Sequence, residues 1–151
     1  MRRIGLVVAV AALLVALSSV VAVAAVRGGT NETDLLYGTA YADTIHALGG
    51  GDTLVGFWGD DLLLGGSGND GISGGPGNDV IYGGPGNDRI HGNDGVEQIY
   101  GGAGNDVITV AGGRSKDFID CGPGFDTVEK QFGSTAPATN VGARNCERTI
   151  F

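Results

Sequence analysis

The chain of 151 residues is long enough for one small domain, and 30 of its residues are glycine. It carries 17 acidic residues against 9 lysines and arginines, a formal net charge of −8. This charge argues against nucleic acid as a partner, because binding to phosphates requires cationic patches, and it favours metal cations.

The first 25 residues have the pattern of a secretory signal peptide. Arg2 and Arg3 form a basic start, residues 4–17 are apolar, and small residues follow up to "AVA" at 22–24. We expect cleavage after residue 24 or 25, a secreted or cell-surface protein, and no membrane association afterwards. Cleavage would bring the net charge to about −10. The alternative is an uncleaved anchor, because residues 4–26 are just long enough to span a bilayer.

Residues 26–129 form a repeat domain with a period of nine, whose units begin at Gly29. With an acid at position six, steps of nine lead from Asp34 to Asp106. Two extra residues, Val110 and Ala111, interrupt the step, which resumes at Asp117. Position six is aspartate in ten of eleven units and Glu97 in the other, and position eight is always aliphatic. Position one is glycine in nine units and position four in eight.

Each column of the repeat has a physical role. Glycines at positions one, two and four permit positive φ and close backbone approach, as a tight turn requires. The aliphatic residue at position eight points inward from a short extended segment, and its two neighbours point outward because side chains alternate along a strand. His46 and His91 fall at outward position nine and should be surface residues. One unit buries a single aliphatic side chain, so we expect the units to stack into a solenoid with parallel strands.

The units "GGSGNDGIS" (65–73), "GGPGNDVIY" (74–82), "GGPGNDRIH" (83–91) and "GGAGNDVIT" (101–109) match G-G-x-G-x-D-x-U-x, where U is apolar. This pattern resembles the RTX (haemolysin-type) calcium-binding nonapeptide repeat, in the form of a short exported bacterial protein. The resemblance implies an all-β fold, a right-handed parallel β-roll or β-solenoid. Alternate turns would stack on opposite edges, and Ca²⁺ would lie between successive turns of one edge.

The calcium ligands that the resemblance implies are the position-six acids and the glycine turns around them. A hard cation takes six to eight oxygens, which carboxylates and carbonyls supply. One edge would carry Asp52, Asp70, Asp88 and Asp106, and the other Asp61, Asp79 and Glu97. The turn glycines are Gly66, Gly68, Gly75, Gly77, Gly84, Gly86, Gly102 and Gly104. Pairing same-edge neighbours, eighteen residues apart, predicts about five sites.

Some units depart from the pattern. For all units, departing or not, the alternative to a cation site is a plain turn. Asn-Asp-Gly clusters also form plain turns, but an acid at one phase in every unit favours a cation. Binding by Asp34 and Asp43 is doubtful, since their units lack glycine at positions two and four. The longer Glu97 side chain should shift or spoil its site. We expect the two-residue insertion to break the stack, which puts Asp117 and Asp126 outside the same ladder.

Residues 130–151 leave the repeat. In an exported protein, Cys121 and Cys146 form a disulfide more readily than they remain free thiols. "DCGPGFDTVE" followed by "NCERT" resembles the C-terminal end of short exported RTX proteins. That resemblance implies a capping tail tied to the last coil by Cys121–Cys146. A disordered end is the alternative.

The sequence predicts no enzyme. It contains neither G-x-S-x-G nor H-E-x-x-H, and "GSGNDG" at 66–71 fits G-x-G-x-x-G only because its glycines fall at repeat positions. We therefore expect an exported, non-enzymatic calcium-binding module that is structural or binds an unidentified partner at the cell surface or outside the cell. The alternative is a calcium-dependent accessory or remnant module of a secreted hydrolase or an RTX toxin.

Overall fold

The structure, a computed structural model, describes residues 25–111, 117–130 and 141–150. These residues form fourteen strands and no helix. In this part of the chain there is consequently no helix long and apolar enough to cross a membrane. The predicted signal peptide lies almost wholly outside the described residues.

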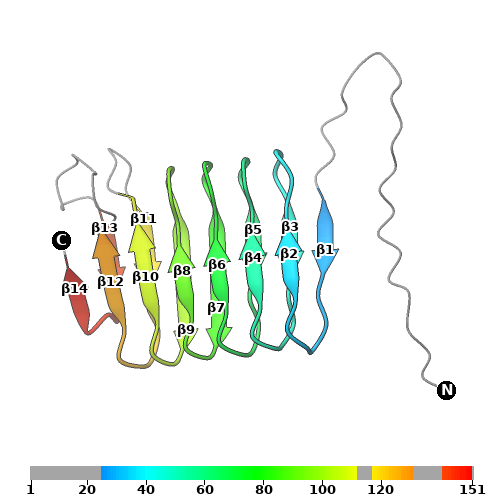
Figure 1. Ribbon diagram of the computed structural model, residues 1–151. Helices are drawn as coiled ribbons and strands as arrows, with labels where there is room; N and C mark the ends of the chain where they lie inside the picture. The colour runs from blue at the N-terminus through cyan, green and yellow to red at the C-terminus, as the bar shows by residue number, and fades with distance from the viewer. Residues whose placement is uncertain (1–24, 112–116, 131–140, 151) are drawn as a thin grey trace, which may run out of the picture.

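The strands alternate along the chain between two seven-stranded sheets, one behind the other in the view of Figure 1. Sheet A consists of β1 (Val26–Gly28), β3 (Thr44–His46), β5 (Leu62–Leu64), β7 (Val80–Pro85), β9 (Gln98–Ala103), β11 (Asp117–Asp120) and β13 (Val141–Arg144). Sheet B consists of β2 (Leu35–Tyr37), β4 (Thr53–Val55), β6 (Gly71–Ser73), β8 (Arg89–His91), β10 (Val107–Val110), β12 (Thr127–Lys130) and β14 (Arg148–Ile150).

All strand pairs within the sheets are parallel, and the register follows the repeat. Leu54 pairs with Ile72, and Ile72 with Ile90, so that position eight always meets position eight two units on. Two units therefore make one full coil, and the turns between them stack on two opposite edges. The expected all-β parallel β-roll is confirmed.

The core is a double column of the position-eight side chains. From Ile45 to Val128 they are fully buried, whereas Leu36, near the N-terminal end of the stack, is only partly buried. Burial of each such side chain contributes about 1.5–3 kcal/mol. His46 and His91 are exposed on the outer faces, as predicted from the alternation of side chains along a strand.

The two-residue insertion, Val110 and Ala111, does not break the stack, so the expectation of a break was wrong. Ile99 pairs with Ile119 and Ile108 with Val128, an offset of twenty residues in place of eighteen. Of the two extra residues, Val110 is the last residue of β10 and pairs with Lys130, and Ala111 begins the connection from β10 to β11. A connection between sheets can lengthen without changing the register of the strands on either side.

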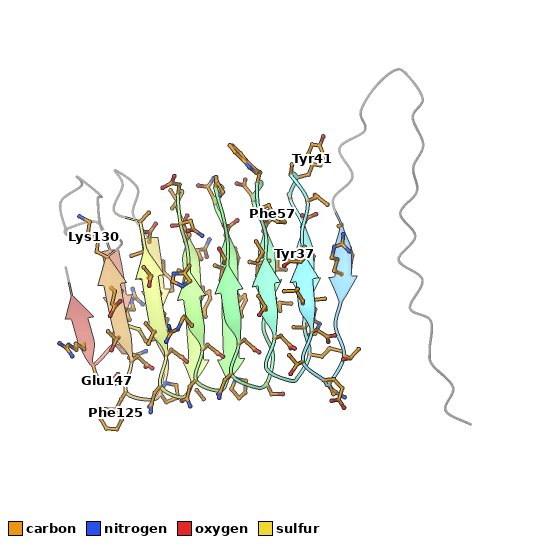
Figure 2. All side chains as sticks on the ribbon, viewed as in Figure 1. Tyr37, Tyr41, Phe57, Phe125, Lys130 and Glu147 are labelled. Carbon is orange, nitrogen blue, oxygen red and sulfur yellow. A yellow bond between two sulfur atoms is a disulfide. The ribbon has the colours of Figure 1, made fainter. Side chains whose placement is uncertain are left out.

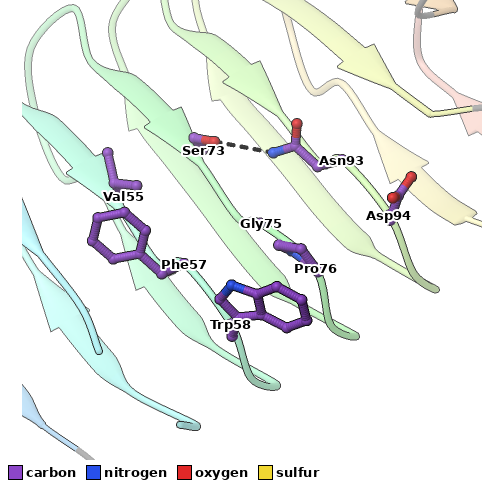
Figure 3. Close-up of a pocket in the computed structure, with 8 residues that line it drawn as sticks. All are labelled: Val55, Phe57, Trp58, Ser73, Gly75, Pro76, Asn93 and Asp94. Atoms are coloured by element: carbon purple, nitrogen blue, oxygen red, sulfur yellow. Dashed lines mark hydrogen bonds between the residues drawn. The ribbon is translucent and has the colours of Figure 1, made fainter. Parts of the chain in front are cut away.

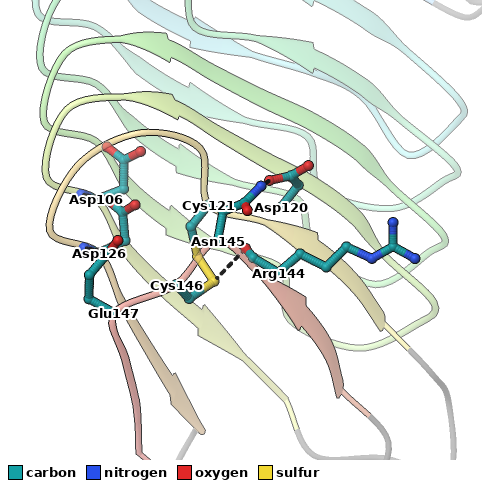
Figure 4. The surroundings of a disulfide bond; sticks show 8 residues. All are labelled: Asp106, Asp120, Cys121, Asp126, Arg144, Asn145, Cys146 and Glu147. Carbon is teal, nitrogen blue, oxygen red and sulfur yellow. Dashed lines mark hydrogen bonds between the residues drawn. A yellow bond between two sulfur atoms is a disulfide. The ribbon is translucent and has the colours of Figure 1, made fainter.

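The C-terminal strands continue both sheets, since β13 pairs with β11 and β14 with β12. The predicted disulfide between Cys121 and Cys146 is confirmed, with the two Cα atoms 5.3 Å apart (Figure 4). Arg144 also lies over the ring of Phe118, 5.3 Å from its centroid. The tail strands are thus attached by backbone pairing, by a covalent bond and by a cation–π contact.

Candidate metal centres in the turns

The position-six acids are buried and form two hydrogen-bonded ladders, one along each edge of the roll. In the first ladder, the N–H of Asp52 donates to Oδ1 of Asp70, and the N–H of Asp70 to Oδ1 of Asp88, both at 2.8 Å. In the second ladder, the N–H of Asp61 donates to Oδ1 of Asp79 at 2.9 Å. One carboxylate oxygen of each acid therefore serves the fold by linking consecutive same-edge turns.

The other carboxylate oxygen is buried without a hydrogen-bond partner. This holds for Oδ2 of Asp52, Asp61, Asp70, Asp79, Asp88, Asp106 and Asp126, and for both Oε atoms of Glu97. A buried carboxylate oxygen without a partner is costly, and native structures rarely leave one so. The same orphaned atom recurs in nearly every central turn, so we ascribe it to a ligand that the fold is built to hold.

The two N-terminal acids lack this orphaned oxygen. In their units threonine stands at position two, and the hydroxyl of Thr30 donates to Oδ2 of Asp34 at 2.8 Å. The hydroxyl of Thr39 lies within hydrogen-bonding distance of both carboxylate oxygens of Asp43. In these two units a threonine hydroxyl is the partner of Oδ2, whereas Oδ2 of the central aspartates has none.

The glycines at position one leave room for two oxygens to meet. A Cβ on Gly83 would lie 2.4 Å from both Oδ2 of Asp88 and the carbonyl oxygen of Gly101. The same crowding by a carboxylate and a carbonyl recurs at Gly65 and Gly74. Glycine is required here because any side chain would displace the oxygens, and not because of a positive φ.

Positions two and four favour glycine for a different reason, because their backbone is left-handed. The predicted turn glycines all have positive φ, for example 101° at Gly66 and 134° at Gly68. A Cβ on Gly68 would lie 1.5 Å from the carbonyl oxygen of Gly50. Position-four carbonyls therefore point into the gap between consecutive same-edge turns, close to the carboxylates.

Burial and the neighbouring acids make these carboxyl groups hard to ionise in the absence of a cation. Burial raises the pKa of Asp88 to about 7, against the lowering effect of the Asp70 N–H, and the Asp106 and Asp70 carboxylates add to the rise. Burial likewise raises the pKa of Asp79 to about 6. The pKa of Glu97 rises to about 9, through burial and the nearby Asp117.

Glu97 interrupts the second ladder. Its carboxylate accepts no hydrogen bond, whereas the corresponding aspartates each accept one. The ladder resumes immediately, because the N–H of Glu97 donates to Oδ1 of Asp117 at 3.2 Å. In the first ladder, the N–H of Asp106 donates to Oδ1 of Asp126 at 2.7 Å. Both acids that the insertion was expected to exclude are thus in register.

Sequence reasoning missed two features of the edges. The N–H of Asp126 donates to the carboxylate of Glu147 at 2.7 Å, which extends the first ladder into the tail (Figure 4). At position five, an outer ladder of asparagine side chains runs beside the acids of the first edge. The N–H of Asn87 donates to Oδ1 of Asn69, and the N–H of Asn105 donates to Oδ1 of Asn87. The recurrence of asparagine before the acid was the available signal for this outer ladder.

The donor set fits a hard cation. Each turn offers one carboxylate at position six, and within the described residues no three acidic, histidine or cysteine side chains gather at one point. The remaining ligands would have to be backbone carbonyls, so the set consists of oxygen alone. Oxygen-only coordination with many carbonyls is typical of Ca²⁺, whereas zinc prefers nitrogen and sulfur.

Comparison with protein families supports this assignment. The RTX calcium-binding nonapeptide repeat (4 copies) matches residues 28–56, 37–72 and 73–108, together more than half of the chain. No curated protein matched the chain. The buried acids, the left-handed glycine turns and the family match agree, and the chain belongs to the RTX family, whose nonapeptide repeats bind Ca²⁺.

Proposed function

We propose that the protein is an exported, non-enzymatic calcium-binding module that acts in secreted form or at the cell surface. Calcium would be held between successive same-edge turns by Asp52, Asp61, Asp70, Asp79, Asp88, Glu97 and Asp106, together with carbonyls of the surrounding glycine turns. The observation that carries this proposal is the unpartnered, buried carboxylate oxygen that recurs from turn to turn.

The continuity of the ladders adds two candidate ligands. Asp126 has the same buried, unpartnered Oδ2 as the central acids. Asp117 follows Glu97 in the second ladder.

The family assignment supports calcium as the ion. The basic and apolar start of the chain supports export. An extracellular location would also supply calcium at the millimolar concentrations that sites of modest affinity require.

Replacement of Asp79 and of Asp34 by alanine should have unequal effects on calcium binding. Asp79→Ala removes a carboxylate whose Oδ2 is buried and unpartnered, whereas the Oδ2 of Asp34 is already bonded to Thr30. We expect Asp79→Ala to lower the calcium stoichiometry by at least about one ion. Asp34→Ala should leave the stoichiometry unchanged.

Isothermal titration calorimetry of both variants and the unmodified chain, all from calcium-depleted buffer, measures this difference. Circular dichroism in calcium-containing buffer controls for folding. Equal losses of bound calcium in the two variants would contradict the assignment of sites to the central turns.

The dependence of stability on pH should reverse when calcium is removed. A carboxyl group whose pKa is raised in the folded state binds more protons there than in the unfolded chain, where aspartate titrates near 3.9. Metal-free stability should therefore fall as the pH rises from about 4 through about 7 for Asp88, and further towards about 9 for Glu97. With calcium, stability should rise over the same range, because the ion binds the deprotonated carboxylates.

Circular dichroism at pH 5 and pH 8 tests this reversal: without calcium the β signal should be stronger at pH 5, and with calcium the Tm should be higher at pH 8. Asp88→Asn is the matched variant, because it mimics the protonated side chain. It should be more stable than the unmodified chain at pH 8 without calcium and less stable with calcium. A metal-free chain with more β structure at pH 8 than at pH 5 would refute the argument.

A further inference from the structure

A trough runs along the outer face of sheet B over β6 and ends at the turns of the second edge. Its floor is formed by the smallest outward side chains of the sheet, Gly71 and Ser73. Gly71 lies between Thr53 and Arg89, and Ser73 between Val55 and His91. A Cβ on Gly71 would meet only one atom within 4 Å, at 3.9 Å, so the floor is open.

The trough widens at the turn that begins at Gly74, directly after β6. There a cavity of about 450 Å³ is lined by Val55, Phe57, Trp58, Ser73, Gly75, Pro76, Asn93 and Asp94. A second hollow of about 200 Å³, over Gly71, shares Val55 and Ser73 with it. The larger cavity falls within the size range of small-ligand pockets. Because the two hollows share residues, they form one continuous trough.

The two walls of the trough differ in chemistry. Figure 3 shows Phe57 and Trp58 on one side and Asn93 and Asp94 on the other, with Gly75 and Pro76 between them. The Asn93 side chain is held in place by a hydrogen bond from its amide to the Ser73 hydroxyl, at 3.0 Å. One wall is thus aromatic, and the other offers amide, carboxylate and hydroxyl groups.

The aromatic wall is exposed at a conformational cost. Trp58 is 64% exposed and Phe57 44% exposed. Phe57 has a φ of 78° at position two, where the next turn of the same edge has Gly75. A bulky residue in this region is uncommon, and the turn imposes a similar φ of 79° on Leu48, at position two of another unit. The ring of Phe57 also stacks on Tyr37, with centroids 5.9 Å apart, which extends the aromatic surface.

We propose that this trough binds a neutral oligosaccharide, with sugar rings against Trp58 and Phe57 and sugar hydroxyls bonded to Asn93, Asp94 and Arg89. A sugar ring has an apolar C–H face and a rim of hydroxyl groups that both donate and accept, which matches one aromatic wall and one polar wall. Arg89 lines the smaller hollow and Asp94 the larger one. Their charges are opposite, so together they add no net charge to the trough at neutral pH. That balance suits a neutral ligand on a protein that is otherwise acidic.

An extended peptide is a poorer match for the trough. Peptides that lie along a sheet gain affinity by pairing their backbone with an exposed edge strand. β6 is paired on both sides, with β4 and with β8, so its backbone groups are already used. A proline-rich peptide docking on the aromatic wall alone is the remaining competitor, and the experiment includes it.

Trp58 is the sole tryptophan of the chain and so reports directly on the trough. Its fluorescence should be titrated in the calcium-loaded full chain with cellohexaose, chitohexaose, maltohexaose and a proline-rich decapeptide. We expect a saturable change in emission with at least one hexasaccharide and none with the decapeptide. Asp94→Ala and Phe57→Gly should each weaken that binding about tenfold or more.

Leu48→Gly is the matched control for Phe57→Gly. Leu48 also occupies position two, on the opposite edge, with a φ of 79° and an exposed fraction of 44%. Neither glycine variant should lower the Tm, because glycine relieves the strained backbone, but only Phe57→Gly should lose saccharide affinity. Phe125→Ala removes another exposed aromatic residue, at the edge opposite Tyr41 (Figure 2). This variant should bind the saccharide with unchanged affinity.

Three results would overturn the proposal: no emission change with any hexasaccharide, a preference for the decapeptide, or equal affinity in Phe57→Gly and Leu48→Gly. Circular dichroism in calcium is recorded on each sample. A calcium-loaded chain without a β spectrum would instead count against the calcium-binding function, so the two failures are distinguishable.

Discussion

Removal of calcium is expected to unfold the roll. In the metal-free chain, eight buried acids have carboxylate oxygens without a partner, and the acids of each ladder repel one another. A circular dichroism spectrum should be coil-like in chelator at neutral pH and β-type in millimolar calcium. The transition should be steep, because each ion joins two turns and so favours ordering of the next.

The size of this effect follows from mass action. Extracellular calcium modules bind with Kd values of about 10⁻⁴–10⁻³ M. At about 1 mM calcium and a Kd near 0.1 mM, each ion adds about 1.4 kcal/mol, and five add about 7 kcal/mol. That is comparable with the whole unfolding free energy of a small domain, about 5–15 kcal/mol.

Magnesium provides the control for this experiment. It requires a tight octahedral shell and gives up water reluctantly, so the same concentration of magnesium should restore little β structure. A chelated protein with the full β spectrum and the same Tm as the calcium-loaded protein would show that the aliphatic columns suffice. In that case the orphaned carboxylate oxygens would need another explanation.

Gly68→Ala is expected to destabilise the calcium-loaded protein by about 3–5 kcal/mol. The new Cβ would lie 1.5 Å from the carbonyl oxygen of Gly50, on a residue whose φ is 134°. Gly50 cannot easily move away, because its N–H is bonded to the carbonyl of Ser67 at 2.9 Å. The substitution therefore forces apart two turns that the first ladder holds together through the Asp52–Asp70 hydrogen bond.

Gly71→Ala is the matched control, three residues further along the chain. Its Cβ would project into the open trough, with no atom closer than 3.9 Å. Alanine is also better than glycine within a strand, so we expect a change of at most about 0.5–1 kcal/mol, in the stabilising direction. Urea unfolding of both variants in calcium measures the two free energies. A loss in Gly71→Ala equal to that in Gly68→Ala would show that the close approach of the turns is not the cause.

The period of nine was sufficient to predict the fold, because a repeat imposes one geometry on every unit. It placed the aliphatic side chains from Ile45 to Val128 in the core and His46 and His91 on the surface, as observed. It also placed acids eighteen residues apart on the same edge, which the ladders bear out. The resemblance to exported RTX proteins implied the disulfide that the structure contains.

Other features depend on contacts between units and could not be read from the period. The insertion predicted a break, yet the strands after it pair normally, because the added residues fall at the end of β10 and in the connection that follows, where they leave the register unchanged. The threonines that satisfy Asp34 and Asp43 looked only like missing glycines, and Glu147 joins a ladder from outside the repeat.

The sequence by itself determined the architecture, the two acidic edges and the class of ion, since these follow from which residue types recur at which phase. Only the tertiary structure showed that a central aspartate uses Oδ1 to bond the preceding turn of its edge and leaves Oδ2 buried without a partner. It also decided which outward side chains become neighbours. Phe57, Ser73 and Asn93 are far apart in sequence, and the parallel register brings them to one trough because each coil advances by eighteen residues.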